Sequence, residues 1–176
     1  GTLTEGRFGV SAAHAHGIEE REALAITAAL ETRSEHPLAQ AIVEEARTRG
    51  LDLPSSQDFE VVAGKGVRGR VDGVTYTVGR PEWIAEQGLD FPPALKRALE
   101  EAEGRGESAI ALMNERSALA VVGLADRVRQ SAKDTVRALK AAGVEPVMIT
   151  GDAEAVARTV AAELGIERYY ARVLPG

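Results

Sequence analysis

The order of extended and helical segments changes along the chain, and this change constrains the fold more than any other sequence feature. Before about residue 120, alternating apolar residues predict antiparallel hairpins, and Asp72-Gly73 between two such runs is typical of a type I′ turn. After Asp126, helix-like and strand-like runs alternate with short loops, ending with a strand expected at 169–173. That alternation is typical of a parallel sheet with crossover helices. We therefore expect an α/β chain built from two different parts.

The first part is predicted to be an α+β module with an antiparallel sheet and flanking helices. Apolar residues recur at helical spacing in 18–30 and again in 39–49. A hairpin, two further helices and a second hairpin at 108–124 follow, whereas 12–17 is expected to be a loop. The second part then holds only some strands of a parallel sheet, so the module is expected to be an insertion into that sheet domain.

Composition excludes several classes of protein and site. The chain has no cysteine, which rules out disulfides, thiolate metal sites and cysteine nucleophiles. A net charge of −6 argues against binding to nucleic acid or to an anionic membrane surface. No apolar run approaches the roughly 20 residues that span a bilayer. His14 and His16 lack a third ligand nearby in the sequence, so no metal-ligating residues are predicted.

The stretch from Glu31 to Leu38 lies between the two predicted helices of the module. Pro37 suits the first turn of the second helix because it has no backbone N–H, and Ser34 is the predicted N-cap. This arrangement would bring Glu31 and His36 together at a helix junction, where a planar ligand could stack or form hydrogen bonds. The alternative is an ordinary helix start with a solvated histidine.

Glycines 64, 66 and 69 form a Gly-x-Gly-x-x-Gly pattern. The pattern lies inside a hairpin and not between a strand and a helix, so it does not predict a dinucleotide site. Glycine allows tight turns and a close approach of a ligand to the backbone. The alternative is a pair of tight turns with bulges and no ligand.

Thr150-Gly151-Asp152 follows the strand expected at 146–149. Ligands of parallel sheets bind beyond the carboxyl ends of the strands, so this tripeptide is a candidate site. The first strand of such a sheet would precede Gly1. The chain also begins at Gly1 without a methionine and stops at Gly176 straight after a strand-like run, so both ends are expected to be cut from a larger protein.

These motifs together, in this order, resemble the heavy-metal-transporting subclass of the P-type ATPases. The resemblance is carried by Gly1-Thr-Leu-Thr-Glu-Gly6, Glu31 with Ser34-Glu-His-Pro37, Gly64-x-Gly66, Asp126-x-x-Arg129, Thr150-Gly151-Asp152 and Leu174-Pro175. The runs Thr4–Val10 and 163–170 look most like B-type copper ATPases. The chain departs from the family pattern in lacking the acceptor aspartate before Gly1 and the Gly-Asp-Gly-x-Asn-Asp segment after Gly176, and in having Arg80 after Gly79.

The resemblance implies an α+β nucleotide-binding domain inserted in a partial haloacid dehalogenase-like (HAD-like, Rossmann-like) phosphorylation domain. The implied domains are 1–9, the start of the phosphorylation domain; 10–122, the nucleotide-binding domain; and 123–176, the remainder of the phosphorylation domain. The implied cofactors are ATP and Mg²⁺. The implied partners are ATP and the actuator and membrane domains of a pump, at the cytoplasmic face of the cell membrane, with no direct membrane contact by this fragment.

The resemblance also assigns roles to residues. The implied nucleotide-binding residues are Glu31, His36, Gly64, Gly66 and Gly79. The implied catalytic residues are Thr2, Thr150, Gly151 and Asp152, which would face the transferred phosphoryl group. Asp126 and Arg129 would form a hinge, and Arg80 could contact phosphate or point to solvent.

The expected function is ATP binding within a heavy-metal export pump, most similar to copper pumps, that works through an aspartyl phosphate. Because the acceptor aspartate is missing, we expect this chain to bind ATP without appreciable turnover. Two alternatives stay open: a haloacid-dehalogenase-type phosphatase with a large cap, and a non-catalytic nucleotide-binding module.

Overall fold

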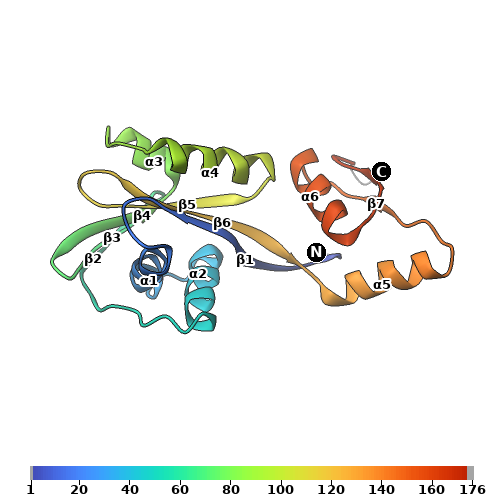
Figure 1. Ribbon diagram of the computed structural model, residues 1–176, viewed down its shortest axis with the longest axis horizontal. Coiled ribbons are helices and arrows are strands. Elements are labelled where there is room, and N and C mark those ends of the chain that lie inside the picture. Colours follow the sequence, from blue (N-terminus) through green and yellow to red (C-terminus); the bar gives the residue numbers. More distant parts are fainter. Residues whose placement is uncertain (1, 174–176) are drawn as a thin grey trace.

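The computed structural model describes residues 2–173, which form two lobes joined by a two-stranded ribbon (Figure 1). The larger lobe contains a six-stranded antiparallel sheet in the order β1-β6-β5-β4-β3-β2. Its strands are β1 (Thr4–Ala15), β2 (Ser56–Val62), β3 (Gly66–Val71), β4 (Val74–Gly79), β5 (Ser108–Met113) and β6 (Ala118–Val128). Its helices are α1 (Glu20–Glu31), α2 (Pro37–Thr48), α3 (Pro81–Glu86) and α4 (Pro93–Gly104). The expected α+β module with an antiparallel sheet is confirmed.

The sheet separates two apolar layers. Helices α1 and α2 cover one face and helices α3 and α4 cover the other (Figure 1). Val121 packs in the layer with α3 and α4, and Val122 packs in the layer with α1 and α2, because successive strand residues point to opposite faces. Fully burying one such side chain contributes roughly 1.5–3 kcal/mol. Both faces of the central strands are therefore needed for stability.

Strand β1 is longer than the sequence suggested. The loop expected at 12–17 was wrong for its first four residues, because β1 continues through Ala15 and pairs with β6 from Thr4↔Val128 to Ala15↔Ala120. This pairing satisfies the backbone hydrogen bonds along the outer edge of β6, which would otherwise be open. Two register shifts interrupt the ladder, between Thr4 and Phe8 and between Val10 and Ala12.

The smaller lobe follows the α–β–α–β order expected after Asp126. It consists of α5 (Gln130–Ala141), β7 (Val147–Ile149), α6 (Glu154–Leu164) and β8 (Arg168–Tyr170), with β7 and β8 parallel. Its core is small and is made by Val136, Met148, Ala157 and their neighbours. The strand expected at 169–173 is shorter and begins one residue earlier. Leu174-Pro175, part of the resemblance, lies outside the described residues.

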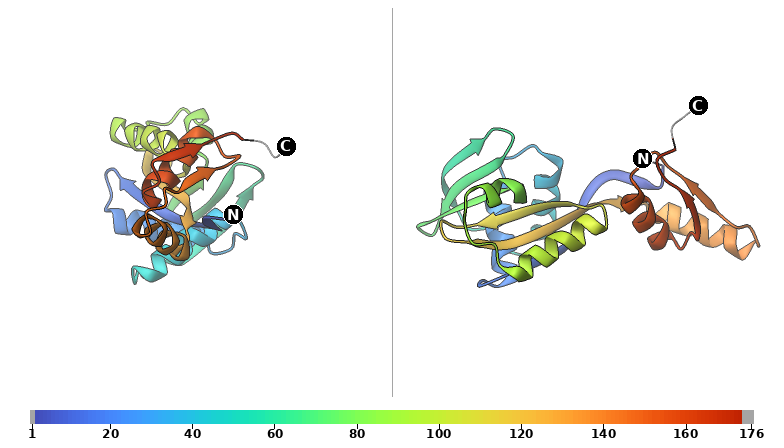
Figure 2. Two further views of the ribbon diagram at one scale, coloured as in Figure 1. Left: turned by 90° about the vertical axis from the view of Figure 1, so that its right-hand side faces the viewer. Right: turned by 90° about the horizontal axis from the view of Figure 1, so that it is seen from above.

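The two lobes touch at two places. The first is the β1–β6 ribbon, which runs from the large sheet into the smaller lobe (Figure 2). The second is the turn between α4 and β5, which lies against α6. The predicted domain limits at 9/10 and 122/123 fall inside β1 and β6, and neither strand is interrupted there. The division of the chain into 1–9, 10–122 and 123–176 stays a prediction.

Candidate functional site

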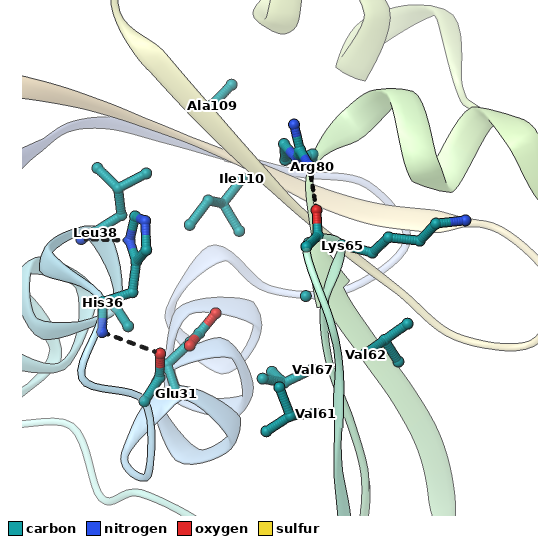
Figure 3. Close-up of a pocket in the computed structure, with 15 residues that line it drawn as sticks. Glu31, His36, Leu38, Val61, Val62, Lys65, Val67, Arg80, Ala109 and Ile110 are labelled. Atoms are coloured by element: carbon teal, nitrogen blue, oxygen red, sulfur yellow. Dashed lines mark hydrogen bonds between the residues drawn. The ribbon is translucent and has the colours of Figure 1, made fainter.

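A cavity of about 470 Å³ opens between the α1–α2 junction and the β2–β3 turn (Figure 3). All of the residues predicted to bind nucleotide line it: Glu31, His36, Gly64, Gly66 and Gly79. They come from two helix ends, one turn and two strand ends, so the fold brings together sequence positions that are far apart. Leu38, Val61, Val62, Val67 and Ile110 supply apolar parts of the wall. These apolar residues were not predicted, because their strand and helix patterns mark them only as core.

The start of α2 differs in one detail from the expectation. Pro37 occupies the first turn as predicted, but the N-cap is His36 and not Ser34. The Nδ1 atom of His36 accepts a hydrogen bond of 3.2 Å from the backbone N–H of Leu38. Pro37 has no N–H, so Leu38 carries the first free donor of the helix within reach of the cap side chain.

Capping also sets the chemistry of the imidazole. When Nδ1 accepts from Leu38, a neutral His36 carries its proton on Nε2. The ring lies beside the cavity wall, close to Leu38 (Figure 3). The ring can therefore stack on a flat ligand while Nε2–H donates a hydrogen bond.

Glu31 ends α1 and is only 6% exposed. Burial raises the pKa of its carboxyl above the ordinary value of 4.5, while hydrogen bonding from Ser34 opposes that rise. The Ser34 hydroxyl oxygen in turn accepts a hydrogen bond of 3.3 Å from the backbone N–H of His36. Ser34 thus links the Glu31 carboxyl to the backbone of His36, and the sequence did not assign it this role.

The glycines of the cavity have different reasons for being glycine. Gly64 has φ +70°, and an added Cβ would meet no atom within 4 Å, so its backbone faces open space. A Cβ on Gly66 would overlap the carbonyl oxygen of Val78. A Cβ on Gly79 would lie 2.6 Å from the carbonyl oxygen of Lys65. Gly66 and Gly79 therefore allow β3 and β4 to meet closely, and Gly64 is the position open to a ligand.

Arg80 follows Gly79 and lies on the cavity wall. Its backbone N–H donates to the carbonyl oxygen of Lys65 at 3.2 Å, and its guanidinium donates to the carbonyl oxygen of Gly64. Lys65 Nζ lies 3.7 Å from a carboxylate oxygen of Glu86. Two cations thus stand at the glycine turn, across the cavity from the buried Glu31 (Figure 3).

A second cavity of about 660 Å³ lies between the two lobes. Its lining includes the predicted catalytic residues Thr2, Thr150, Gly151 and Asp152. The Thr150 hydroxyl donates to Asp152 Oδ2 at 2.7 Å and accepts from the Asp152 backbone N–H at 3.2 Å. These polar groups follow β7 at its carboxyl end, which is where the sequence argument placed them.

The predicted hinge residues stabilise the ribbon. Asp126 Oδ1 accepts a hydrogen bond from the backbone N–H of Arg7 at 3.1 Å. Arg129 donates from Nε to the carbonyl oxygen of Thr4 at 2.7 Å. Asp126 also lines the cavity between the lobes. Both residues therefore attach β6 and its end to β1, and a hinge role stays a prediction.

A buried carboxylate in the cavity between the lobes was missed. The side chain of Glu107 is 5% exposed and receives hydrogen bonds from Arg105 Nε at 2.8 Å and from Ser11 Oγ at 2.8 Å. No local pattern marks it, because Ser11 is remote in sequence.

Few side chains of the described residues are arranged so that they could bind a metal ion. Within residues 2–173, no group of three or more histidine, aspartate or glutamate side chains gathers where it could hold a metal ion. Asp152 and the Thr150 hydroxyl offer oxygen ligands of the kind that Mg²⁺ takes together with substrate phosphates. No helix in this part of the chain is long and apolar enough to cross a membrane.

The chain is similar in sequence to a hydrolase family and to curated P-type ATPases. The family model of haloacid dehalogenase-like hydrolases matches residues 1–175. A copper-exporting P-type ATPase B of Archaeoglobus fulgidus is 42% identical over 175 residues, covering 99% of this chain and 25% of that protein. The chain thus spans about a quarter of the length of the curated relatives it matches.

Solved structures match as well. A crystal structure of a zinc-transporting PIB-type ATPase has a TM-score of 0.85 at 32% identity, over 99% of this chain and 28% of that one. The catalytic domain of the CPx-ATPase CopB-B, solved in a study of its conformational changes upon nucleotide binding, has a TM-score of 0.61 at 26% identity. That match covers 98% of this chain and 58% of the other.

Proposed function

The chain belongs to the haloacid dehalogenase-like hydrolase family, and from that premise we propose that it binds ATP as part of a heavy-metal P-type ATPase. One observation carries the proposal: Glu31, His36, Gly64, Gly66 and Gly79 line a single cavity. Its volume of about 470 Å³ lies within the range of roughly 300–1,000 Å³ usual for small-molecule sites. The phosphatase alternative is not favoured, since the matched relatives are P-type ATPases over 99% of this chain.

The purine ring is assigned to the helix junction. His36 offers a flat imidazole and an Nε2–H donor, and the Glu31 carboxyl can accept from an exocyclic amine. The apolar side chains of the wall exclude water from the faces of the ring. The phosphate chain is assigned to the glycine turn, where the backbone at Gly64 is open.

The cavity between the lobes is assigned to the phosphoryl group that is transferred. The hydroxyl of Thr2 and the backbone N–H of Gly151 can donate to phosphoryl oxygens, and the Thr150 hydroxyl can do so when it turns away from Asp152. Asp152 and Thr150 would hold Mg²⁺, which neutralises charge on phosphate oxygens when it is bound. In this proposal the residues of this cavity bind the phosphoryl group, and none of them is assigned as its covalent acceptor.

The parent protein is proposed to be a copper-exporting pump with actuator and membrane domains, with this chain at the cytoplasmic face of the membrane. The proposal of copper as the transported ion is based on the names of the curated relatives. The structural neighbour with a TM-score of 0.85 is named as a zinc-transporting ATPase. Determinants of the transported ion are therefore assigned to parts of the pump beyond this chain.

Titration calorimetry with ATP tests the nucleotide assignment. We expect millimolar to high-micromolar affinity, which corresponds to a binding free energy of roughly −4 to −6 kcal/mol. Glu31→Ala and His36→Ala should each weaken binding by about a factor of ten, the scale of one lost hydrogen bond or stack. Glu35→Ala is the matched control, since Glu35 is exposed and is not among the cavity residues. Titration curves that are unchanged in both cavity variants would reduce the junction to an ordinary helix start.

A further inference from the structure

Arg80 combines two features that no other residue of the first cavity shares. Its guanidinium holds the carbonyl oxygen of Gly64, so it ties the end of β4 to the β2–β3 turn. It is also a cation on the cavity wall for which no ion pair is found within residues 2–173, whereas Lys65 pairs with Glu86. A guanidinium has five N–H donors, and the bond to Gly64 uses only part of that capacity.

The cavity is electrically asymmetric. Glu31 lies at the helix junction and Arg80 lies across from it at the glycine turn (Figure 3). An anionic group is repelled from the Glu31 end whenever that carboxyl is ionised and is attracted to the Arg80 end. A nucleotide can therefore satisfy both ends only with its base at the junction and its phosphates at the turn.

We propose that Arg80 is the specificity-determining residue that makes this cavity select nucleotides by their phosphate charge. Its donors that do not hold Gly64 bind phosphate oxygens, while its bond to Gly64 keeps the turn in place. The inference rests on the proposed function and goes one step beyond it, because it assigns discrimination among adenosine, AMP, ADP and ATP to one side chain.

A purely structural role makes a different prediction. If Arg80 only held the glycine turn, its loss would distort the cavity for every ligand and lower the affinities for adenosine and ATP by the same factor. If Arg80 binds phosphate, its loss lowers the affinity for ATP and leaves the affinity for adenosine nearly unchanged. The ratio of the two affinities therefore separates the roles, whatever the change in overall stability.

The experiment titrates adenosine, AMP, ADP and ATP into the wild-type chain, Arg80→Gln and Arg80→Lys. Glutamine keeps an N–H donor for Gly64 without the charge, and lysine keeps the charge without the planar fork. We expect Arg80→Gln to weaken ADP and ATP by about tenfold and adenosine by less than about twofold, on the scale of one charge-assisted hydrogen bond. Arg80→Lys should weaken ADP and ATP binding less than Arg80→Gln does. Added salt should reduce the difference in ATP affinity between the wild type and Arg80→Gln.

Arg97→Ala is the control for net charge, because Arg97 is an exposed residue of α4 on the opposite face of the sheet. It should leave all four affinities unchanged. Equal losses for adenosine and ATP in Arg80→Gln, or no loss for either, would overturn the role of Arg80 while leaving the cavity a nucleotide site. A wild-type chain that binds none of the four ligands would overturn the proposed function itself.

Discussion

The hydroxyl of Thr159 on α6 donates a hydrogen bond of 3.0 Å to the backbone carbonyl oxygen of Arg105, at the end of α4, and shares its proton with the carbonyl oxygen of Ala155, also at 3.0 Å. Beside it, Arg158 Nη2 donates to the carbonyl oxygen of Gly104 at 2.9 Å. Gly106 packs so closely on α6 that an added Cβ would lie 2.7 Å from Val156 Cγ2. The large lobe thus rests on the small lobe through one turn, in addition to the β1–β6 ribbon.

Removing the Thr159 hydroxyl should loosen the two lobes relative to each other. Thr159→Val keeps the shape of the side chain but loses a hydrogen bond worth about 0.5–1.5 kcal/mol. The chain has no cysteine, so spin labels at Arg116→Cys and Arg137→Cys report a single distance between the lobes. We expect the distance distribution to broaden in the valine variant.

The control for that measurement is Thr48→Val, because the Thr48 hydroxyl also bonds a helix carbonyl, that of Glu44, but within one lobe. It should leave the distribution as it is in the wild type. A distribution that Thr159→Val does not change would mean that the ribbon alone sets the orientation of the lobes.

Glu31→Gln should stabilise the fold at neutral pH while weakening ATP binding. Burial raises the pKa of Glu31 above 4.5, so the folded state favours the protonated carboxyl. The stability that this group contributes is fully present below its unfolded pKa and is lost as pH rises through the folded pKa. Glutamine imitates the neutral form, so the variant should be more stable at pH 7 by on the order of 1 kcal/mol. Urea unfolding at pH 7 and pH 4.5 measures the difference, which should shrink at the lower pH.

Glu35→Gln is the matched control, since Glu35 is exposed and should show no such pH-dependent gain. A loss of stability in Glu31→Gln at pH 7 would mean that the ionised carboxyl is held by its hydrogen bond to Ser34 more strongly than burial opposes it.

Gly79→Ala should destabilise the fold, because the new Cβ would lie 2.6 Å from the Lys65 carbonyl oxygen and 2.7 Å from the Trp83 ring. Such overpacking typically costs about 1–3 kcal/mol. Gly104→Ala is the control: no atom lies within 4 Å of its added Cβ, and the residue ends α4. Gly104→Ala should leave the free energy of unfolding unchanged or raise it by roughly 0.5 kcal/mol. Urea unfolding measures this free energy for both variants. Equal free energies of unfolding for Gly79→Ala and Gly104→Ala would contradict the close approach at Gly79.

Local sequence determines where α2 begins but not which residue caps it. The missing N–H of Pro37 predicts that the helix begins there, and it does. The capping residue was predicted wrongly, because Ser34 and His36 both carry side-chain acceptors that could bind a free backbone N–H at the start of α2. Which one caps depends on the backbone path between α1 and α2, and that path is determined by how the two helices pack on the sheet.

The sequence by itself determined the local elements, the type I′ turn at Asp72-Gly73 and the change from hairpins to an α–β–α–β order, because these depend on neighbouring residues. It also predicted residues that the fold brings to the walls of the two cavities, although their roles there stay predictions. The tertiary structure alone decided that β1 extends along β6, that Arg80 closes the glycine turn, and that Glu107 is buried beside Ser11. Each of these contacts joins positions remote in sequence. They form because a strand edge, a carbonyl or a carboxylate must find a partner when it leaves water, and no local pattern specifies which partner that will be.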